Sequence, residues 1–199
     1  DHGDYFGDHW LGEKELFHEP SARIPLLVYD PDPAADATRG TTDDRFVEAI
    51  DIVPTILEAM GVGVSSSRIE GASLVPSLRQ QPAVAWRDAA FSEIDYAFYA
   101  ARRTLGLEPN AARACMIRSS RWKYVYFRGF RAQLFDLVND PGELVDLGES
   151  PAHAGVRAEH QAMLLERLTG RRSRVTMDDA TVDARTDASH RIGIHIGRW

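Results

Sequence analysis

The stretch from Asp1 to Lys14 gathers most of the side chains that could do chemistry. Asp1 and His2 stand side by side before Gly3, and Lys14 follows after a short interval. A carboxylate oxygen and an imidazole nitrogen can together ligate a divalent cation, and a glycine lets the backbone approach closely because it has no Cβ. The ammonium of Lys14 can hold an oxygen of a phosphoryl, phosphonyl or sulfuryl group as a point charge. The pattern therefore predicts a site in which a cation and a lysine neutralise a tetrahedral anion.

Asp1 and His2 alone would make an incomplete metal site. Zinc usually takes three protein ligands and a substrate, and harder cations take about six oxygen donors. Asp8 and His9 form a rival pair. A binding module that uses all four residues as one complete metal site is therefore an alternative, and an ordinary solvated loop is another. The glycines between the two pairs disfavour a helix that would place both histidines on one face.

Composition narrows the classes of protein. The chain has 199 residues, is 44% hydrophobic and carries a net charge of −7, so it can bury a core and is not expected to grip nucleic acid. No apolar run approaches the roughly 20 residues that cross a bilayer, and we expect a soluble, cytoplasmic chain with no membrane partner. The single cysteine, Cys115, has apolar neighbours that predict a buried, unreactive thiol.

The hydrophobic pattern predicts an α/β fold. Residues 23–29 form a continuous apolar run typical of a strand covered on both faces. Residues 51–61 predict a helix laid against that sheet, with Asp51 as its N-cap and Gly61 as its stop. Clustered strands without alternating helices follow and favour a small antiparallel sheet, which a helix over 154–168 then covers. These strands are predicted within residues 89–94, within 114–127 with a bend at Ser119-Ser120, and within 133–147, which also contains an Asn-Asp-Pro-Gly turn.

Several motifs carry a family resemblance. Asp1-His2-Gly3-Asp4, Gly7-Asp8-His9, Lys14 and the run over 17–26 resemble the sulfatase branch of the alkaline phosphatase superfamily, most of all its phosphonate monoester hydrolases. The resemblance covers nearly the whole chain, but only the C-terminal part of such an enzyme. It continues through residues 51–61, 71–78, 121–126, 133–143 and 191–199.

The resemblance implies a fold, an activity and a set of cofactors. The fold would be the end of a large mixed sheet followed by a small antiparallel sheet with a covering helix. The activity would be metal-dependent hydrolysis of phosphonate monoesters or phosphate diesters through a formylglycine nucleophile, which attacks phosphorus or sulfur and then releases the anion. Sulfate esters are the close competitor, as in an arylsulfatase. The metal would be one divalent ion, either manganese, calcium, magnesium or zinc.

The resemblance also assigns roles to residues. Asp1 and His2 would be metal ligands, and Lys14 would contact the anion and the leaving group. Four further residues would orient these groups or close the loop, namely Asp4, Asp8, His9 and His18. Glu19 and Arg23 are expected to form a structural charge pair beside the strand.

The nucleophile motif of the family, Cys/Ser-x-Pro/Ala-x-Arg, does not occur in the sequence. Cys115-Met116-Ile117-Arg118 lacks its spacing. We therefore expect the nucleophile and the remaining metal ligands on polypeptide upstream of Asp1, and the 199-residue chain alone to be inactive. The alternative from another class is a noncatalytic assembly or oligomerisation module.

Three regions are predicted. Residues 1–84 would close the large metal-binding domain, residues 85–170 would form the small sheet and its helix, and residues 171–199 would form a polar C-terminal arm with a short helix. In the arm, alternation of Ile192, Ile194 and Ile196 with small or polar residues predicts a half-buried terminal strand. Such a strand needs a partner, supplied either by its own subunit or by a second copy, and we expect a homo-oligomer.

Overall fold

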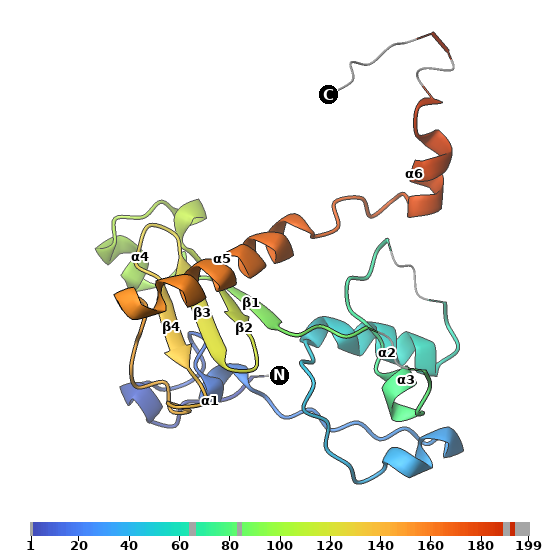
Figure 1. Cartoon of the computed structure of the whole chain (residues 1–199), viewed down its shortest axis with the longest axis horizontal. Coiled ribbons are helices and arrows are strands. Elements are labelled where there is room, and N and C mark those ends of the chain that lie inside the picture. Colours follow the sequence, from blue (N-terminus) through green and yellow to red (C-terminus); the bar gives the residue numbers. More distant parts are fainter. Residues whose placement is uncertain (1, 64–66, 83–84, 189–191, 194–199) are drawn as a thin grey trace.

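The computed structural model describes residues 2–63, 67–82, 85–188 and 192–193 and contains a four-stranded antiparallel sheet, which lies in the left half of Figure 1. The strand order is β1-β2-β3-β4, so each strand pairs with its neighbour in the sequence. The strands that the sequence predicts here are confirmed, including the bend between the second and third. Their bounds are Ala90–Asp95 for β1, Arg113–Arg118 for β2, Trp122–Phe127 for β3 and Gln133–Asp136 for β4.

The two faces of the sheet are covered by different parts of the chain. Consecutive side chains of a strand point to opposite faces. Met116 accordingly joins a core cluster with Phe17 from the N-terminal segment. Ile117 joins another cluster with Leu164 of α5, the helix Ala154–Thr169 that the sequence predicts. The segment that holds the candidate site therefore packs on the face opposite α5.

Helix α2, Ile52–Ala59, forms where the sequence predicts it, but its surroundings differ from the prediction. It packs beside α3, Val75–Leu78, to one side of the sheet (Figure 1). Met60, at the C-terminal end of α2, is 72% exposed. Asp51 is the N-cap residue of α2, as predicted, but its carboxylate makes no capping hydrogen bond to this helix. It instead pairs with Arg87 and accepts the N–H of Ala72 at 2.8 Å.

The prediction of a buried strand over 23–29 is wrong. The segment has no regular secondary structure, no strand among the described residues pairs with it, and all of its residues are exposed. Leu27 and Tyr29 are 89% and 74% exposed. Apolar composition favours a buried strand, but a strand forms only where a neighbour supplies the hydrogen-bond ladder and a layer covers its faces.

The remaining elements are short. Figure 1 shows α6 lying away from the sheet, within the region predicted as an arm. The predicted terminal strand at 192–196 lies outside the described residues, apart from Ile192 and Gly193 in a turn. Within the described part of the chain, no helix has the length and apolar character that a membrane crossing requires. The other helices are α1 Glu19–Ala22, α4 Ala100–Thr104 and α6 Asp179–Arg185, with 3-10 turns at Asp8–Trp10, Pro33–Thr38, Ala49–Asp51, Pro109–Ala111 and Pro151–His153.

Candidate functional site

The loop before α1 is folded back on itself. Tyr5 is almost fully buried, and its N–H donates to the Glu13 carbonyl at 2.8 Å. His9 and Leu16 have φ angles of 53° and 83°, in the left-handed region that non-glycine residues rarely adopt. Each such residue costs about 1–3 kcal/mol and persists only where its surroundings hold it. The loop is therefore held in one shape by its tertiary contacts rather than by local preference.

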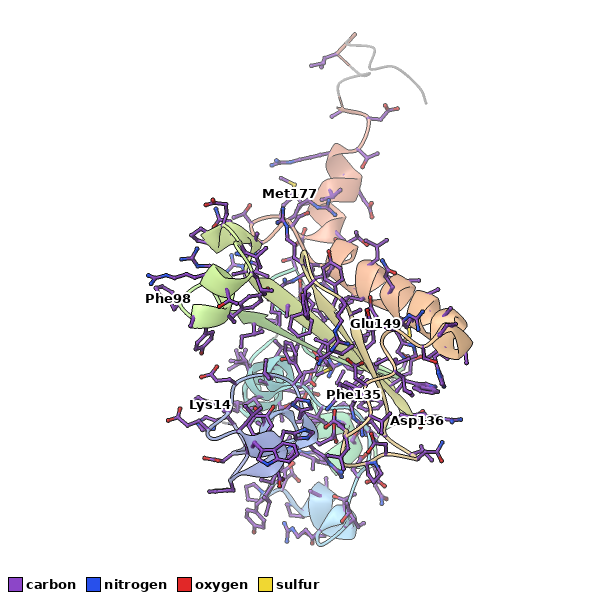
Figure 2. The ribbon with its side chains drawn as sticks, turned by 90° about the vertical axis from the view of Figure 1, so that its left-hand side faces the viewer. Lys14, Phe98, Phe135, Asp136, Glu149 and Met177 are labelled. Carbon is purple, nitrogen blue, oxygen red and sulfur yellow. The ribbon has the colours of Figure 1, made fainter. Side chains whose placement is uncertain are left out.

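One buried residue of α1, Ser21, joins both ends of this loop. The Ser21 carbonyl accepts the N–H of Gly3 at 3.0 Å, and the Ser21 hydroxyl donates to the carbonyl of Lys14. A Cβ on Gly3 would lie 1.8 Å from the carbonyl oxygen of Pro20, so only glycine fits there. The backbone next to His2 and the backbone of Lys14 are thus held by the same residue. The Lys14 side chain is exposed at the outer edge of the N-terminal segment (Figure 2).

The ring of His2 is oriented by its own backbone. Nδ1 lies 2.7 Å from the carbonyl oxygen of Gly3. Because a carbonyl oxygen only accepts hydrogen bonds, Nδ1 carries the proton and the lone pair of a neutral ring lies on Nε2. This is the tautomer that suits an imidazole ligand. Asp1, the predicted companion ligand, lies outside the described residues.

A complete metal site is not seen in the part of the chain that the structure describes. No group of three or more His, Cys, Asp or Glu side chains is placed there to hold a metal ion. The donor set fits a metal only in part, since His2 has a suitable tautomer but a cation needs more ligands than this chain is seen to bring together.

Asp4 and Asp8 lie in the turns of the loop. The Asp4 carboxylate accepts the N–H of Phe6 at 2.8 Å and so closes a turn. Asp8 is exposed and begins the 3-10 turn Asp8–Trp10. His9, in the same turn, stacks on His18 with 4.0 Å between ring centroids and 18° between planes. Nitrogen lone pairs lie in the ring plane, so two stacked imidazoles do not aim them at a shared cation.

His18 lies where the loop meets the sheet. Its Nδ1 is 2.8 Å from the Tyr5 hydroxyl oxygen. Its ring packs in a T-shaped arrangement against that of Phe135, with 5.6 Å between the ring centroids. Burial, then the charges of His9 and Lys123, lower the pKa of His18 to about 4. Burial raises the pKa of Tyr5 to about 12. Near neutral pH the Tyr5 hydroxyl therefore donates to a neutral His18 imidazole.

Glu19 does not form the predicted pair with Arg23. Its carboxylate lies 2.9 Å from the Lys123 amine and 3.3 Å from Arg118, whereas Arg23 is exposed. Glu19 pairs with Lys123 rather than Arg23 because Lys123 is fully buried in β3, where a charged amine is stable only beside carboxylates. Sequence analysis missed both Lys123 and Ser21 as contributors to the site. The one local signal was a lone lysine among inward-facing positions of an otherwise apolar strand.

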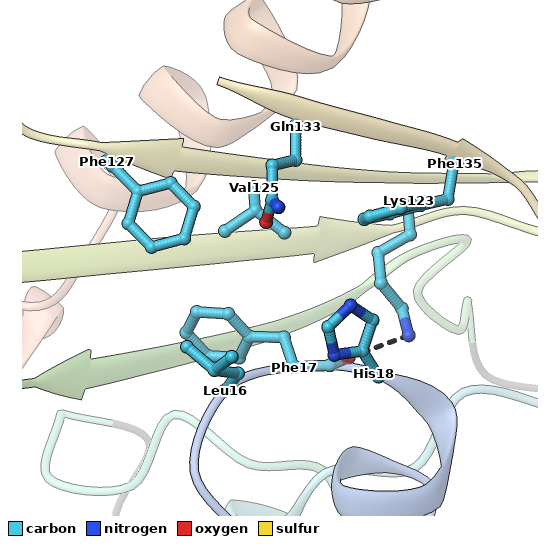
Figure 3. Close-up of a pocket in the computed structure, with 8 residues that line it drawn as sticks. All are labelled: Leu16, Phe17, His18, Lys123, Val125, Phe127, Gln133 and Phe135. Carbon is cyan, nitrogen blue, oxygen red and sulfur yellow. Dashed lines mark hydrogen bonds between the residues drawn. The ribbon is translucent and has the colours of Figure 1, made fainter. Parts of the chain in front are cut away.

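The cavity beside His18 is too small for a substrate. Figure 3 shows it between the loop and the sheet, with the Lys123 amine directed to the carbonyl of Phe17 and lying beside the His18 ring. Its volume is about 10 Å³, room for about one water. A larger groove of about 450 Å³ lies elsewhere, where Arg45 and Arg87 stack on Trp86, and no predicted site residue lines it.

Comparison with known proteins decides the family. The model of the N-sulphoglucosamine sulphohydrolase C-terminal family matches residues 7–171. The chain belongs to this family. It is 35% identical over 173 residues to the multifunctional alkaline phosphatase superfamily protein PehA of Trinickia caryophylli, covering 85% of this chain and 33% of that protein. It is 31% identical to an arylsulfatase of Clostridium perfringens, covering 86% of this chain and 33% of that protein.

The fold is shared with a solved structure. The phosphonate monoester hydrolase of Agrobacterium radiobacter superposes with a TM-score of 0.75 at 37% identity, covering 83% of this chain and 33% of that chain. The α/β fold class and membership of the sulfatase branch of the alkaline phosphatase superfamily are therefore confirmed. This chain spans about a third of the length of the relatives that it matches.

Proposed function

We propose that this chain forms the C-terminal part of a metal-dependent hydrolase that cleaves phosphonate monoesters or phosphate diesters, with sulfate esters as the alternative substrates. The observation that carries the proposal is the double attachment of Ser21 to Gly3 and to the Lys14 carbonyl. Because the backbone beside His2 and the backbone of Lys14 bond to the same residue, this attachment supports a role for both in one site. Two of the relatives described above bear the names of an arylsulfatase and a phosphonate monoester hydrolase, which supports the same reaction class.

The chain's own residues would act at the substrate anion. His2, through Nε2, and Asp1 would hold one divalent cation, either manganese, calcium, magnesium or zinc. When bound, such a cation neutralises nonbridging oxygens and lowers the pKa of the nucleophile. Lys14 would offset the negative charge that develops on the leaving oxygen. Asp4, Asp8, His9 and His18 would hold the loop in shape, and formylglycine would come from polypeptide outside these 199 residues.

Exposed apolar surface supports the idea that further polypeptide completes the enzyme. Leu27 and Tyr29 on the unpaired segment and Met60 beside α2 are mostly exposed. Large contiguous apolar surface in water is unfavourable, and it usually marks an interface. In this proposal residues 1–84 close a larger α/β domain, residues 85–170 form the small sheet and its helix, and the chain alone is inactive.

Kinetics of the full-length protein that contains this chain would test the proposal. An aryl phosphonate monoester, a phosphate diester and an aryl sulfate are compared as substrates. Replacing Lys14 with alanine is expected to lower kcat by about 100-fold, the usual effect of removing one charge-stabilising group. The matched control, Arg103→Ala, removes an exposed cation from α4 and is expected to keep full activity. Equal rates for the Lys14→Ala variant and the parent would refute the role of Lys14.

Assembly and location remain predictions. We propose that residues 171–199 join copies into a homo-oligomer in the cytoplasm. Deleting residues 191–199 is expected to reduce the mass measured by light scattering while the circular dichroism spectrum is retained. An unchanged mass would contradict this proposal.

A further inference from the structure

The only described lysine besides Lys14 is enclosed between the sheet and the loop. Lys123 is fully buried in β3, and its amine has three oxygen partners from two other parts of the chain. It donates to the Phe17 carbonyl at 2.7 Å and lies 2.9 Å from the Glu19 carboxylate and 2.6 Å from that of Glu143. The Phe17 carbonyl accepts a hydrogen bond from the amine, and the two carboxylates lie at ion-pair distance from it.

Glu143 also binds the backbone at the start of α1. Its second carboxylate oxygen accepts the N–H of Glu19 at 2.5 Å, at the start of α1. Glu143 is 2% exposed, so this carboxylate depends on Lys123 for its counter-charge. Burial alone would raise the pKa of Glu19, but the charge and hydrogen bond of Lys123, with those of Arg118, hold this pKa below its usual value. Glu19 is therefore held as a carboxylate beside the Lys123 amine, and Glu143 lies against the same amine.

This cluster of one lysine and two glutamates is linked through α1 to the two backbone segments of the candidate site, at Gly3 and at Lys14. It holds Phe17 and Glu19, and Glu19 begins the turn that carries Ser21. Ser21 in turn holds Gly3 and the backbone of Lys14. A displacement of α1 would therefore move the Lys14 backbone and the backbone beside His2 together.

We infer that Lys123 is a positioning residue: through its ion pairs with Glu19 and Glu143 it fixes α1, and α1 fixes the position of Lys14 relative to the substrate anion. The inference rests on the proposed anion contact of Lys14. A buried ion cluster is weak evidence of added stability, because apolar residues of the same size often serve as well or better. Its directional bonds can, however, specify one geometry for the loop, and reacting groups are sensitive to displacements of about 1 Å.

The test is a double-mutant cycle in the full-length enzyme. Lys123→Met alone leaves two buried carboxylates and can unfold the protein, so the working variant is Lys123→Met with Glu143→Gln. This pair removes one charge of each sign, keeps an acceptor for the Glu19 N–H and leaves Glu19 its contact with Arg118. The matched control is Arg121→Met, which removes a cation paired with Asp136 on the same sheet.

The expected result is a kcat lowered by about tenfold with KM changed by less than about threefold, since binding is retained while alignment is lost. Introduced into the Lys14→Ala enzyme, the same pair of changes is expected to lower kcat by less than about twofold, because coupled residues do not add. The Arg121→Met control is expected to leave kcat unchanged in both backgrounds. An equal loss of kcat with and without Lys14 would overturn the inference.

Amide hydrogen exchange separates this inference from the proposed function. In the double variant, the amides of Gly3, Glu19 and Ser21 are expected to exchange at least about tenfold faster, while those of β2 and β3 keep the parent rates. If Lys14→Ala leaves kcat unchanged, the role of Lys14 fails, and the exchange rates still decide whether Lys123 fixes the loop. Parent exchange rates at all three amides would overturn the inference whatever the kinetics show.

Discussion

Protonation of His18 is expected to destabilise the fold in mild acid. The pKa of its imidazole is about 4 in the folded chain, against an ordinary 6.5. Between these values the unfolded chain binds one more proton than the folded chain, so the free energy of unfolding rises with pH and falls as the pH drops from 6.5 toward 4. At 1.36 kcal/mol per pH unit the full shift corresponds to at most about 3 kcal/mol. Because the ring is partly exposed, solvent screening reduces this to about 1–2 kcal/mol.

Urea unfolding at about pH 7.5 and about pH 4.5 measures this effect in the parent chain and in His18→Gln. Glutamine cannot be protonated and keeps an oxygen that can accept the Tyr5 hydroxyl. The parent is expected to lose about 1–2 kcal/mol more than His18→Gln between the two pH values. The control, Gln133→Ala, alters the same small cavity without a titrating group and is expected to keep the pH dependence of the parent. Equal losses in the parent and in His18→Gln would refute the reasoning.

Three further predictions concern packing and buried charge. Gly3→Ala places a Cβ 1.8 Å from the carbonyl oxygen of Pro20, so α1 must shift, and thermal unfolding should show a loss of about 1–3 kcal/mol. Leu164→Ala opens a cavity between α5 and the sheet and should lower the free energy of unfolding in urea by about 2–5 kcal/mol. Arg87→Met leaves the buried Asp51 carboxylate without its counter-charge and should cost about 3–5 kcal/mol in the same assay. A loss below about 0.5 kcal/mol in any of the three, the usual limit for surface changes, would contradict the contact concerned.

Most of the small sheet could be predicted from the sequence, because its strands and its helix are indicated by the pattern of apolar residues within short segments. Neighbouring residues of a strand, such as Met116 and Ile117, belong to core clusters on opposite faces of the sheet. The apolar stripe of α5 packs on one of these faces. The segment over 23–29 shows the limit of such reasoning. Its apolar side chains indicate burial, yet burial requires a partner layer, and none of the described residues supplies one.

The positions of the site residues could not be predicted, because they depend on contacts between distant parts of the chain. The motif suggests Lys14 as an anion contact, but Ser21 sets the path of its backbone. The charge pair expected between Glu19 and Arg23 is local, whereas the observed partner of Glu19 is Lys123. A buried ammonium has a stronger need for a carboxylate than an exposed guanidinium, and only the fold reveals which cation is buried.

The loop and the small sheet therefore depend on each other. The described part of the loop contains five non-glycine residues with positive φ angles, and its only regular element is the 3-10 turn Asp8–Trp10, which is too short to hold this shape alone. The sheet in turn would expose a buried lysine and the apolar face around Met116 if the loop were absent. Each part removes the unfavourable surface of the other, which argues that they fold as one cooperative unit. Under the proposed function, this unit would also keep Lys14 in place, because the sheet holds α1 and Ser21 of α1 holds the Lys14 backbone.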